Sequence, residues 1–131
     1  MPLAKVASGG EISRILLGFK KVLSDSTETC VMVFDEIDSG ISGKTANVVG
    51  LKLKDLATRS QILCVSHLAQ IAAFADKHFL VSKHSEKGRT KSQLVELAEE
   101  ESLHEIARLL SGNEVSKASL ENAKNLIEKA K

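Results

Sequence analysis

The strongest chemical signal in the sequence is an acidic pair that follows a short apolar run. Cys30–Phe34 is unbroken by polar residues, and Asp35 and Glu36 come next. Such a run is typical of a strand buried on both faces of a parallel sheet. Ligands bind α/β sheets at the carboxyl ends of strands, where an aspartate can hold Mg²⁺. The adjacent glutamate would face an attacking water, although a solvated strand end has the same pattern.

A second apolar run brings a histidine to the same predicted edge. Gln61–Ser66 repeats the buried-strand pattern, and His67 follows it. Because successive parallel strands end at the same side of a sheet, we expect His67 beside the acidic pair, where it could hydrogen-bond a terminal phosphate. The other three histidines lack such a position and are interpreted as ordinary surface or core residues: His78, His84 and His104.

The third candidate is a glycine-led helix start formed by Ser8, Gly9 and Gly10. Bare backbone N–H groups at a helix N-terminus attract anions, and glycines allow a phosphate to approach closely. Ser8 or a neighbouring glycine can cap the helix, with Glu11 in its first turn. Most triplets of this kind are ordinary turns. The apolar residues that predict the helix recur at Ile12, Ile15, Leu16, Phe19 and Leu23.

These motifs need a sheet and helices to position them. Strand, helix and strand over residues 30–66 form a βαβ unit, which predicts an α/β fold with a parallel sheet. The length of 131 residues predicts a single domain over residues 1–131. The predicted helices are 11–23, 45–57, 67–75, 99–110 and 116–129, and the predicted strands are 30–34, 61–66, 78–82 and 90–97, with a polar turn over 85–89.

Gly40–Thr45 has a superficial likeness to a phosphate-binding P-loop. The P-loop motif has four residues between its first glycine and its Gly-Lys pair, whereas here two residues separate Gly40 from Gly43. Asp38 stands where the first glycine should be. We therefore interpret residues 41–46 as a loop that enters a helix.

Composition favours neither nucleic-acid binding nor a membrane partner. Eighteen Lys and Arg against 17 Asp and Glu leave a net charge of +1, and aromatic residues make up only 3%. No apolar stretch is long enough to span a bilayer and residues 1–10 have no signal-peptide pattern, so a cytoplasmic protein is expected. Cys30 and Cys64 are interpreted as buried apolar residues, because Cys64 and His67 lack the second ligand pair of a zinc site.

In combination and order, these motifs resemble those of ABC-type and SMC-type ATPase heads. Ser8–Glu11 is similar to the ABC signature motif, Cys30–Glu36 to Walker B with its glutamate, Ile37–Gly40 to the D-loop and His67 to the switch histidine. The resemblance runs from about residue 2 into the last helices. Three runs resemble the SMC-like ATPases of bacterial DNA double-strand break repair most closely: Lys5–Glu11, Phe34–Gly43 and Ser66–Ala73.

The resemblance implies roles for three residues around ATP held by the P-loop of the same full-length protein. Asp35 would help to hold Mg²⁺, and Glu36 would polarise the water that attacks the γ-phosphate. His67 would contact that phosphate. Phosphoryl transfer of this kind depends mainly on positioning and electrostatics, so a half-site without a phosphate cradle should be nearly inert.

The resemblance also implies a second head in a homodimer. Ser8, Gly9 and Gly10 would close over ATP bound to that head, and Asp38 would lie at the head–head interface. DNA would be contacted through the full-length protein.

The expected fold is therefore the parallel-sheet carboxy-terminal lobe of an ABC-type (P-loop NTPase) ATPase head that lacks the P-loop lobe. The sequence has no P-loop lysine, Q-loop or coiled coil, which this family carries upstream. We expect a fragment, with Met1 an added initiator, whose partner is the amino-terminal half of the same head. Nucleoid association of the active protein follows from the implied repair function.

Two other functions stay open at this stage. Leu103–Leu110 followed by Val115–Leu126 has the pattern of a DNA-binding helix-turn-helix, although glutamates offset the lysines of the second segment and the turn is long. A receiver-like α/β domain could bind Mg²⁺ at Asp35 without hydrolysis. Such a domain needs neither the Ser-Gly-Gly helix start nor His67.

Overall fold

The structure, a computed structural model, describes residues 8–23, 31–86, 89–112 and 114–131. Its elements in chain order are α1 (Gly9–Leu23), β1 (Val31–Phe34), α2 (Gly43–Ala57), β2 (Gln61–Cys64), α3 (Ala69–Ala72), β3 (Phe79–Glu86), β4 (Arg89–Glu96), α4 (Glu99–Ser111) and α5 (Lys117–Ala130). Some predictions lie outside the described residues: the amino-terminal segment 1–7, the polar break 24–29, Cys30 in the first strand, residues 87–88 of the turn, and Asn113.

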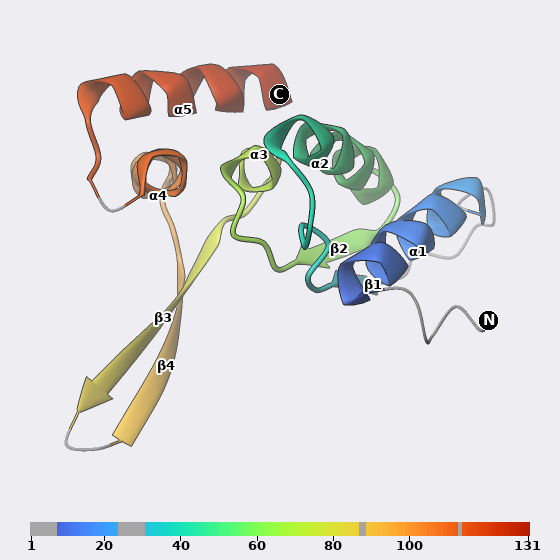
Figure 1. Ribbon diagram of the computed structural model, residues 1–131, viewed down its shortest axis with the longest axis horizontal. Coiled ribbons are helices and arrows are strands. Elements are labelled where there is room, and N and C mark those ends of the chain that lie inside the picture. Colours follow the sequence, from blue (N-terminus) through green and yellow to red (C-terminus); the bar gives the residue numbers. More distant parts are fainter. Residues whose placement is uncertain (1–7, 24–30, 87–88, 113) are drawn as a thin grey trace.

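The predicted βαβ unit is confirmed. β1 and β2 pair in parallel, with Val31 opposite Gln61 and Phe34 opposite Cys64. α2 connects them and packs on one face of the sheet (Figure 1). The helix begins at Gly43, two residues before the predicted start, because Ser42 is its extended N-cap residue. The chain is thus a mixed α/β protein with a two-stranded parallel sheet.

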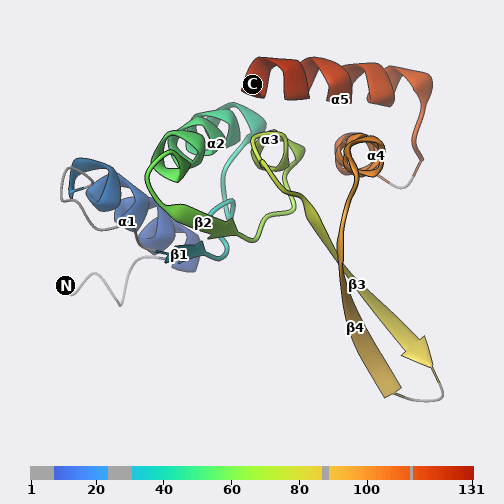
Figure 2. The ribbon, with the colours of Figure 1, turned by 180° about the vertical axis from the view of Figure 1, so that it is seen from behind.

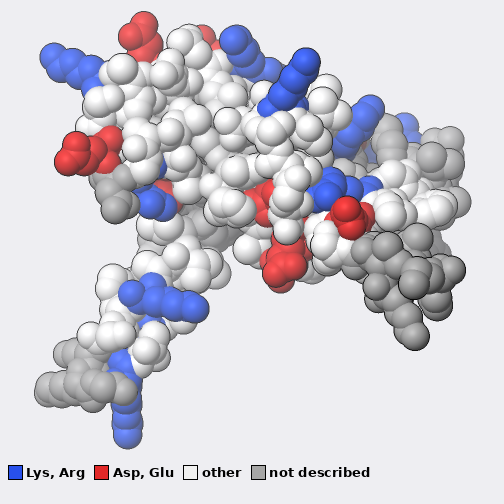
Figure 3. All heavy atoms as spheres, viewed as in Figure 1, with Lys and Arg blue, Asp and Glu red and all other residues white. Residues whose placement is uncertain are grey.

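β3 and β4 form a separate antiparallel hairpin that extends away from the helices (Figures 1 and 2). The turn predicted over residues 85–89 is too long, because Ser85 pairs with Thr90 and Glu86 with Arg89. The polar residues of this segment do not alternate with apolar ones, so their pattern did not predict a strand. Every residue of β4 is exposed, and no face of it requires apolar side chains. Figure 3 shows basic side chains along this hairpin.

Two apolar clusters meet at α3, which is shorter than predicted but contributes to both. Ile71 packs with the residues between α2 and the sheet, while Ala69 and Ala73 pack against α4 and α5. The first cluster contains Leu17, Met32, Phe34, Ile37, Ala46, Val49, Leu53, Leu56 and Ile71. The second contains Ala69, Ala73, Ile106, Ala107, Ala123 and Ala130. Small alanines allow the last helices to approach closely.

The second face of the parallel sheet has no such cover. Val33 on β1 is 64% exposed and Val65, just after β2, is 61% exposed. The apolar stripe of α1 is also exposed, with Phe19 at 62%, and Leu17 is the only buried apolar side chain among those described for this helix. Parallel sheets are normally covered on both faces, and contiguous exposed apolar surface marks a packing site. Within the described residues, no helix is both long and apolar enough to cross a membrane.

Gly50 sets the distance between α2 and α3, which generates a first prediction. A Cβ at Gly50 would overlap the Phe74 ring and lie 3.2 Å from the carbonyl oxygen of Gln70. Gly50→Ala should therefore lower the free energy of unfolding by about 1–3 kcal/mol, against the usual helical preference for alanine. Urea denaturation of both proteins measures this difference.

Gly18→Ala is the matched control, because a Cβ at this α1 position meets nothing within 4 Å. We expect the Gly18 variant to be as stable as the parent or more stable by up to about 1 kcal/mol. Equal unfolding midpoints for the Gly50 and Gly18 variants would contradict the close packing of α2 and α3.

Candidate functional site

The acidic pair lies directly after β1, with both side chains exposed. The Oδ1 atom of Asp35 accepts a hydrogen bond from the backbone N–H of Glu36 at 2.9 Å. Glu36 has a φ of 54°, a left-handed conformation that is unfavourable for a residue with a Cβ. Glycine would adopt it without strain. A glutamate held in this conformation is the kind of outlier that occurs at functional sites.

Asp38 and His67 connect the ends of the two parallel strands. The Oδ2 atom of Asp38 accepts hydrogen bonds from Ser66 Oγ at 2.7 Å and from the backbone N–H of His67 at 2.8 Å. The same oxygen lies 2.9 Å from Nδ1 of the His67 ring. Burial by itself would raise the pKa of Asp38, but the hydrogen bonds from Ser66 and His67 outweigh it and hold this pKa below the usual carboxyl value.

The predicted glycine-led helix start is confirmed, with Ser8 as its cap. Ser8 Oγ accepts a hydrogen bond from the backbone N–H of Glu11 at 3.3 Å. The Glu11 carboxylate in turn accepts one from the Ser8 backbone at 2.8 Å. This reciprocal pair is a capping box, which fixes the direction in which the chain enters α1.

The first turns of α1 hold the segment that follows β1. Ser13 Oγ donates to the carbonyl oxygen of Asp35 at 3.0 Å. Arg14 Nη1 donates to the carbonyl oxygens of Ile37 at 3.0 Å and Ser39 at 2.8 Å. Sequence reasoning missed Ser13 and Arg14, because they look like ordinary polar positions of an amphipathic helix. Only the folded chain shows that they bind backbone more than 20 residues away.

Direct contacts therefore bring all three predicted motifs together. The acidic pair and Asp38 lie in one turn, α1 packs on one side of this turn, and His67 contacts it from the end of β2. Asp35, Glu36 and His67 are exposed, as a phosphate-facing site requires, whereas Asp38 is buried. The side chain of Asp38 points into its own chain, and its role at a head–head interface stays a prediction.

Cys64 is adjacent to this site, and the prediction that it is buried is wrong, because the residue lies exposed at the end of β2, whose outer face has no cover among the described residues. It is nevertheless not suited to metal binding. Desolvation around the thiol, followed by the negative charges of Asp38 and Asp35, raises its pKa to about 11. The thiol therefore stays protonated near neutral pH, whereas zinc binds the thiolate. In the described ranges, no three His, Cys, Asp or Glu residues are grouped so that they could hold a metal ion.

Asp35, by contrast, could serve as one ligand of a cation whose other ligands are water molecules and phosphate oxygens. Only its Oδ1 has a hydrogen bond among the described residues. Mg²⁺ in nucleotide sites keeps several waters and uses one or two carboxylates together with phosphate oxygens. A single aspartate at the strand end therefore suits Mg²⁺ that is shared with a triphosphate.

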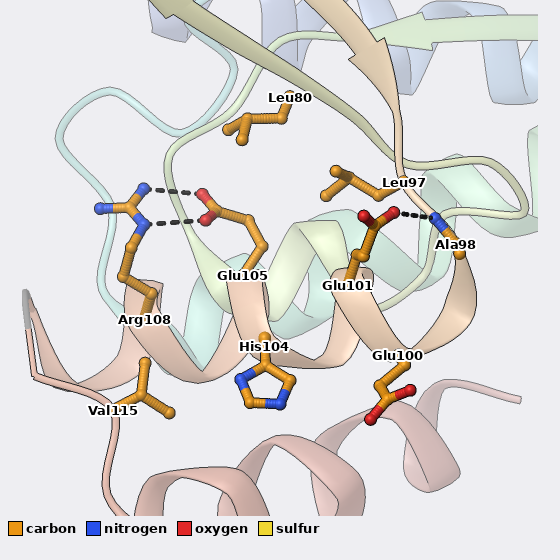
Figure 4. A pocket seen from close by; sticks show the side chains of 9 residues that line it. All are labelled: Leu80, Leu97, Ala98, Glu100, Glu101, His104, Glu105, Arg108 and Val115. Carbon is orange, nitrogen blue, oxygen red and sulfur yellow. Dashed lines mark hydrogen bonds and ion pairs between the residues drawn. The ribbon is translucent and has the colours of Figure 1, made fainter.

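A pocket of about 540 Å³ lies elsewhere, at the base of the hairpin against α4 (Figure 4). Two of its carboxylates already have partners, since Glu101 accepts from the Ala98 backbone at 2.8 Å and Glu105 pairs with Arg108 at 2.6 Å. The pocket contains none of the predicted site residues. Its lining consists of Leu80, Leu97, Ala98, Glu100, Glu101, His104, Glu105, Arg108 and Val115.

The two glycines of the helix start differ in what surrounds them, which gives a second prediction. A Cβ at Gly10 would lie 2.6 Å from the Glu36 carbonyl oxygen, whereas one at Gly9 would meet only the movable Glu36 carboxylate at 2.9 Å. Gly10→Ala should cost about 1–3 kcal/mol of stability, and Gly9→Ala less than about 0.5 kcal/mol. Thermal unfolding of both variants checks this; equal losses would contradict the contact between α1 and the turn.

The lowered pKa of Asp38 gives a third prediction, about acid stability. A carboxyl whose pKa is lower in the folded chain stabilises the fold above its unfolded pKa, and this contribution is lost as the pH falls through the folded pKa. Asp38→Asn should therefore cost about 1–3 kcal/mol at neutral pH and progressively less below about pH 4.

Urea unfolding at a series of pH values measures this dependence. Asp76→Asn is the control, because that exposed carboxylate pairs with Lys54 away from the turn. If the stability difference between the parent and Asp38→Asn does not shrink on acidification, the pKa of Asp38 is not lowered in the folded chain.

Comparison with known proteins relates the chain to one group. No protein-family model matches it. The DNA repair protein RecN of Halalkalibacterium halodurans is 44% identical over 129 residues, which are 98% of this chain and 23% of that protein. RecN of Deinococcus radiodurans is 50% identical over 126 residues, covering 96% and 22%. The chain thus spans less than a quarter of the length of these curated relatives.

A solved structure supports the fold. It comes from a study of ATP-driven dimerization and DNA stimulated activation of SMC ATPases, and it superposes with a TM-score of 0.53 at 23% identity. The match covers 76% of this chain and 59% of that one. At this identity the likeness concerns the fold alone. The predicted resemblance to proteins of bacterial DNA repair is confirmed by sequence: the chain is similar to the carboxy-terminal part of RecN proteins.

Proposed function

We propose that this chain is the carboxy-terminal lobe of an ATP-hydrolysing head in a RecN-like protein of DNA double-strand break repair. The observation that carries this proposal is the convergence of Asp35, Glu36 and His67 at the ends of two paired parallel strands. The similarity to RecN proteins and to the SMC ATPase fold supports it. Residues 1–131 would then act as one lobe and not as a complete enzyme.

The exposed residues of the site have chemistry that suits phosphoryl transfer. Asp35 would hold Mg²⁺, which neutralises phosphate charge when bound with ATP. The Glu36 carboxylate would accept a hydrogen bond from the attacking water and orient it. The ring of His67, which is 76% exposed, would contact the terminal phosphate. Each group only positions or stabilises charge, so a phosphate cradle from elsewhere is needed.

The uncovered sheet face indicates where that cradle would be supplied. β1 has Val31 and Val33 on the same side, because alternate residues of a strand point to the same face. Asp35 directly follows the strand and continues this alternation. Whatever covers the exposed valines therefore comes next to Asp35. We propose that the P-loop lobe of the same head, together with its coiled coil, packs here. The relatives have more than three quarters of their length outside the matched part.

A second head would complete the functional unit. Ser8 and Gly9 are exposed at the start of α1, beside the Glu36 carboxylate, where they could close over ATP bound to a partner head. DNA would be engaged by the full-length protein, at the nucleoid in the cytoplasm. The comparisons do not favour the helix-turn-helix function, because the similarity to RecN proteins continues through α4 and α5. They give no support to a receiver-like domain either.

The proposal predicts the ATPase activity of a chimera. In RecN of Halalkalibacterium halodurans, this chain would replace the matching carboxy-terminal part. We expect ATP turnover by the chimera, a loss of about 100-fold or more in kcat for Glu36→Gln, and negligible turnover by the chain alone. A coupled phosphate-release assay measures all three.

Glu128→Gln is the matched control, since Glu128 is exposed on α5 and far along the chain from the site. It should leave kcat within about twofold. Full activity of the Glu36→Gln chimera would refute the role of Glu36, and robust turnover by the isolated chain would refute the division of the head into two lobes.

A further inference from the structure

We propose that Asp38 is a positioning residue for His67 within the same chain, which sets the ring so that Nε2 faces the phosphate. The inference rests on the proposed function, and it gives Asp38 a task other than one at a head–head interface. Its basis is the hydrogen-bond geometry between the turn after β1 and the end of β2.

One carboxylate oxygen gathers the groups that define the position of the histidine. Asp38 Oδ2 receives Ser66 Oγ at 2.7 Å, the His67 N–H at 2.8 Å and His67 Nδ1 at 2.9 Å. The hydroxyl and the N–H fix the backbone at the strand end, while the ring contact fixes the side-chain orientation. Holding both the backbone and the ring of one residue restricts it far more than a ring contact alone.

The burial of the pair is strongly asymmetric. The Asp38 side chain is 4% exposed, and the His67 side chain is 76% exposed. A buried carboxylate without hydrogen-bond donors would be costly, so its donors are held in place as firmly as it is. The imidazole therefore contacts a fixed, buried carboxylate on one side, while most of its surface is exposed.

The contact also decides which ring nitrogen can meet a phosphate. An ionised carboxylate only accepts hydrogen bonds, so a ring nitrogen 2.9 Å from Asp38 Oδ2 makes a favourable contact only when it carries a hydrogen, and we place that hydrogen on Nδ1. Nε2 is the remaining nitrogen. A phosphate oxygen is likewise an acceptor, so the ring donates to both neighbours when it carries both hydrogens.

Asp38 is itself held rigidly by α1. Arg14 Nη1 donates to the carbonyl oxygens of the residues on either side, Ile37 at 3.0 Å and Ser39 at 2.8 Å. The buried Ile37 anchors the same turn in the apolar cluster beneath α2. α1 therefore holds the turn, the turn holds Asp38, and Asp38 in turn holds His67.

A double-mutant cycle in the RecN chimera tests the inference. Asp38→Asn and His67→Ala should each lower kcat about tenfold or more, with the KM for ATP changed by less than about threefold. Because Asp38 acts through His67, the double variant should be no slower than His67→Ala alone. If the two losses multiply, Asp38 has only a structural role and the proposal fails. Asp76→Asn, the same change at an exposed ion pair, should stay within about twofold.

The protonation of the His67 ring can be measured by NMR on the unaltered chain. This experiment needs no ATPase activity and does not depend on whether a substituted chain folds. ¹⁵N-histidine labelling should show the hydrogen of the His67 ring on Nδ1, in the neutral or the cationic form. A neutral ring that carries its hydrogen on Nε2 would overturn the proposal. A chimera that has no ATPase activity with the unaltered chain would instead refute the proposed function and leave this ring measurement decisive.

Discussion

A buried aspartate connects the ends of the two parallel strands, because one of its oxygens accepts two hydrogen bonds and also contacts the His67 ring. Asp38 takes the hydroxyl of Ser66 and both the backbone and the ring of His67, and these partners more than offset the effect of burial on its pKa. Among the described residues, no other side-chain hydrogen bond links the turn after β1 to the segment after β2. The turn that carries the exposed acidic pair is thus joined to the exposed His67 through a residue that is itself buried.

The turn itself is shaped by close backbone approach from α1. Gly10 is buried against the Glu36 carbonyl oxygen, while Ser13 and Arg14 bind the carbonyl oxygens of the turn. These contacts hold Glu36 at a positive φ that its side chain disfavours. A glycine there would remove the strain and also the carboxylate. The conformational cost is therefore retained at the residue whose carboxylate the proposed function requires.

Among the described residues, the parallel sheet is covered on one face only. Its α2 face is packed with apolar residues, whereas the valines of the other face remain exposed together with the stripe of α1. The chain spans less than a quarter of its relatives' length, and such a surface is consistent with the second lobe that we propose to pack there. The hairpin of β3 and β4 also exposes apolar side chains, Val81 and Leu94.

The sequence determined the local elements and the order of motifs. Apolar runs ending in Asp35 and His67 predicted parallel strands, and Ser8 with its glycines predicted a capped helix, because these features depend on residues close in the chain. The burial of Asp38, the contacts of Arg14 and the outward face of α1 depend on residues more than 20 positions apart, which no local pattern encodes. Only the tertiary structure decided them, since packing chooses which polar groups are enclosed and which remain free.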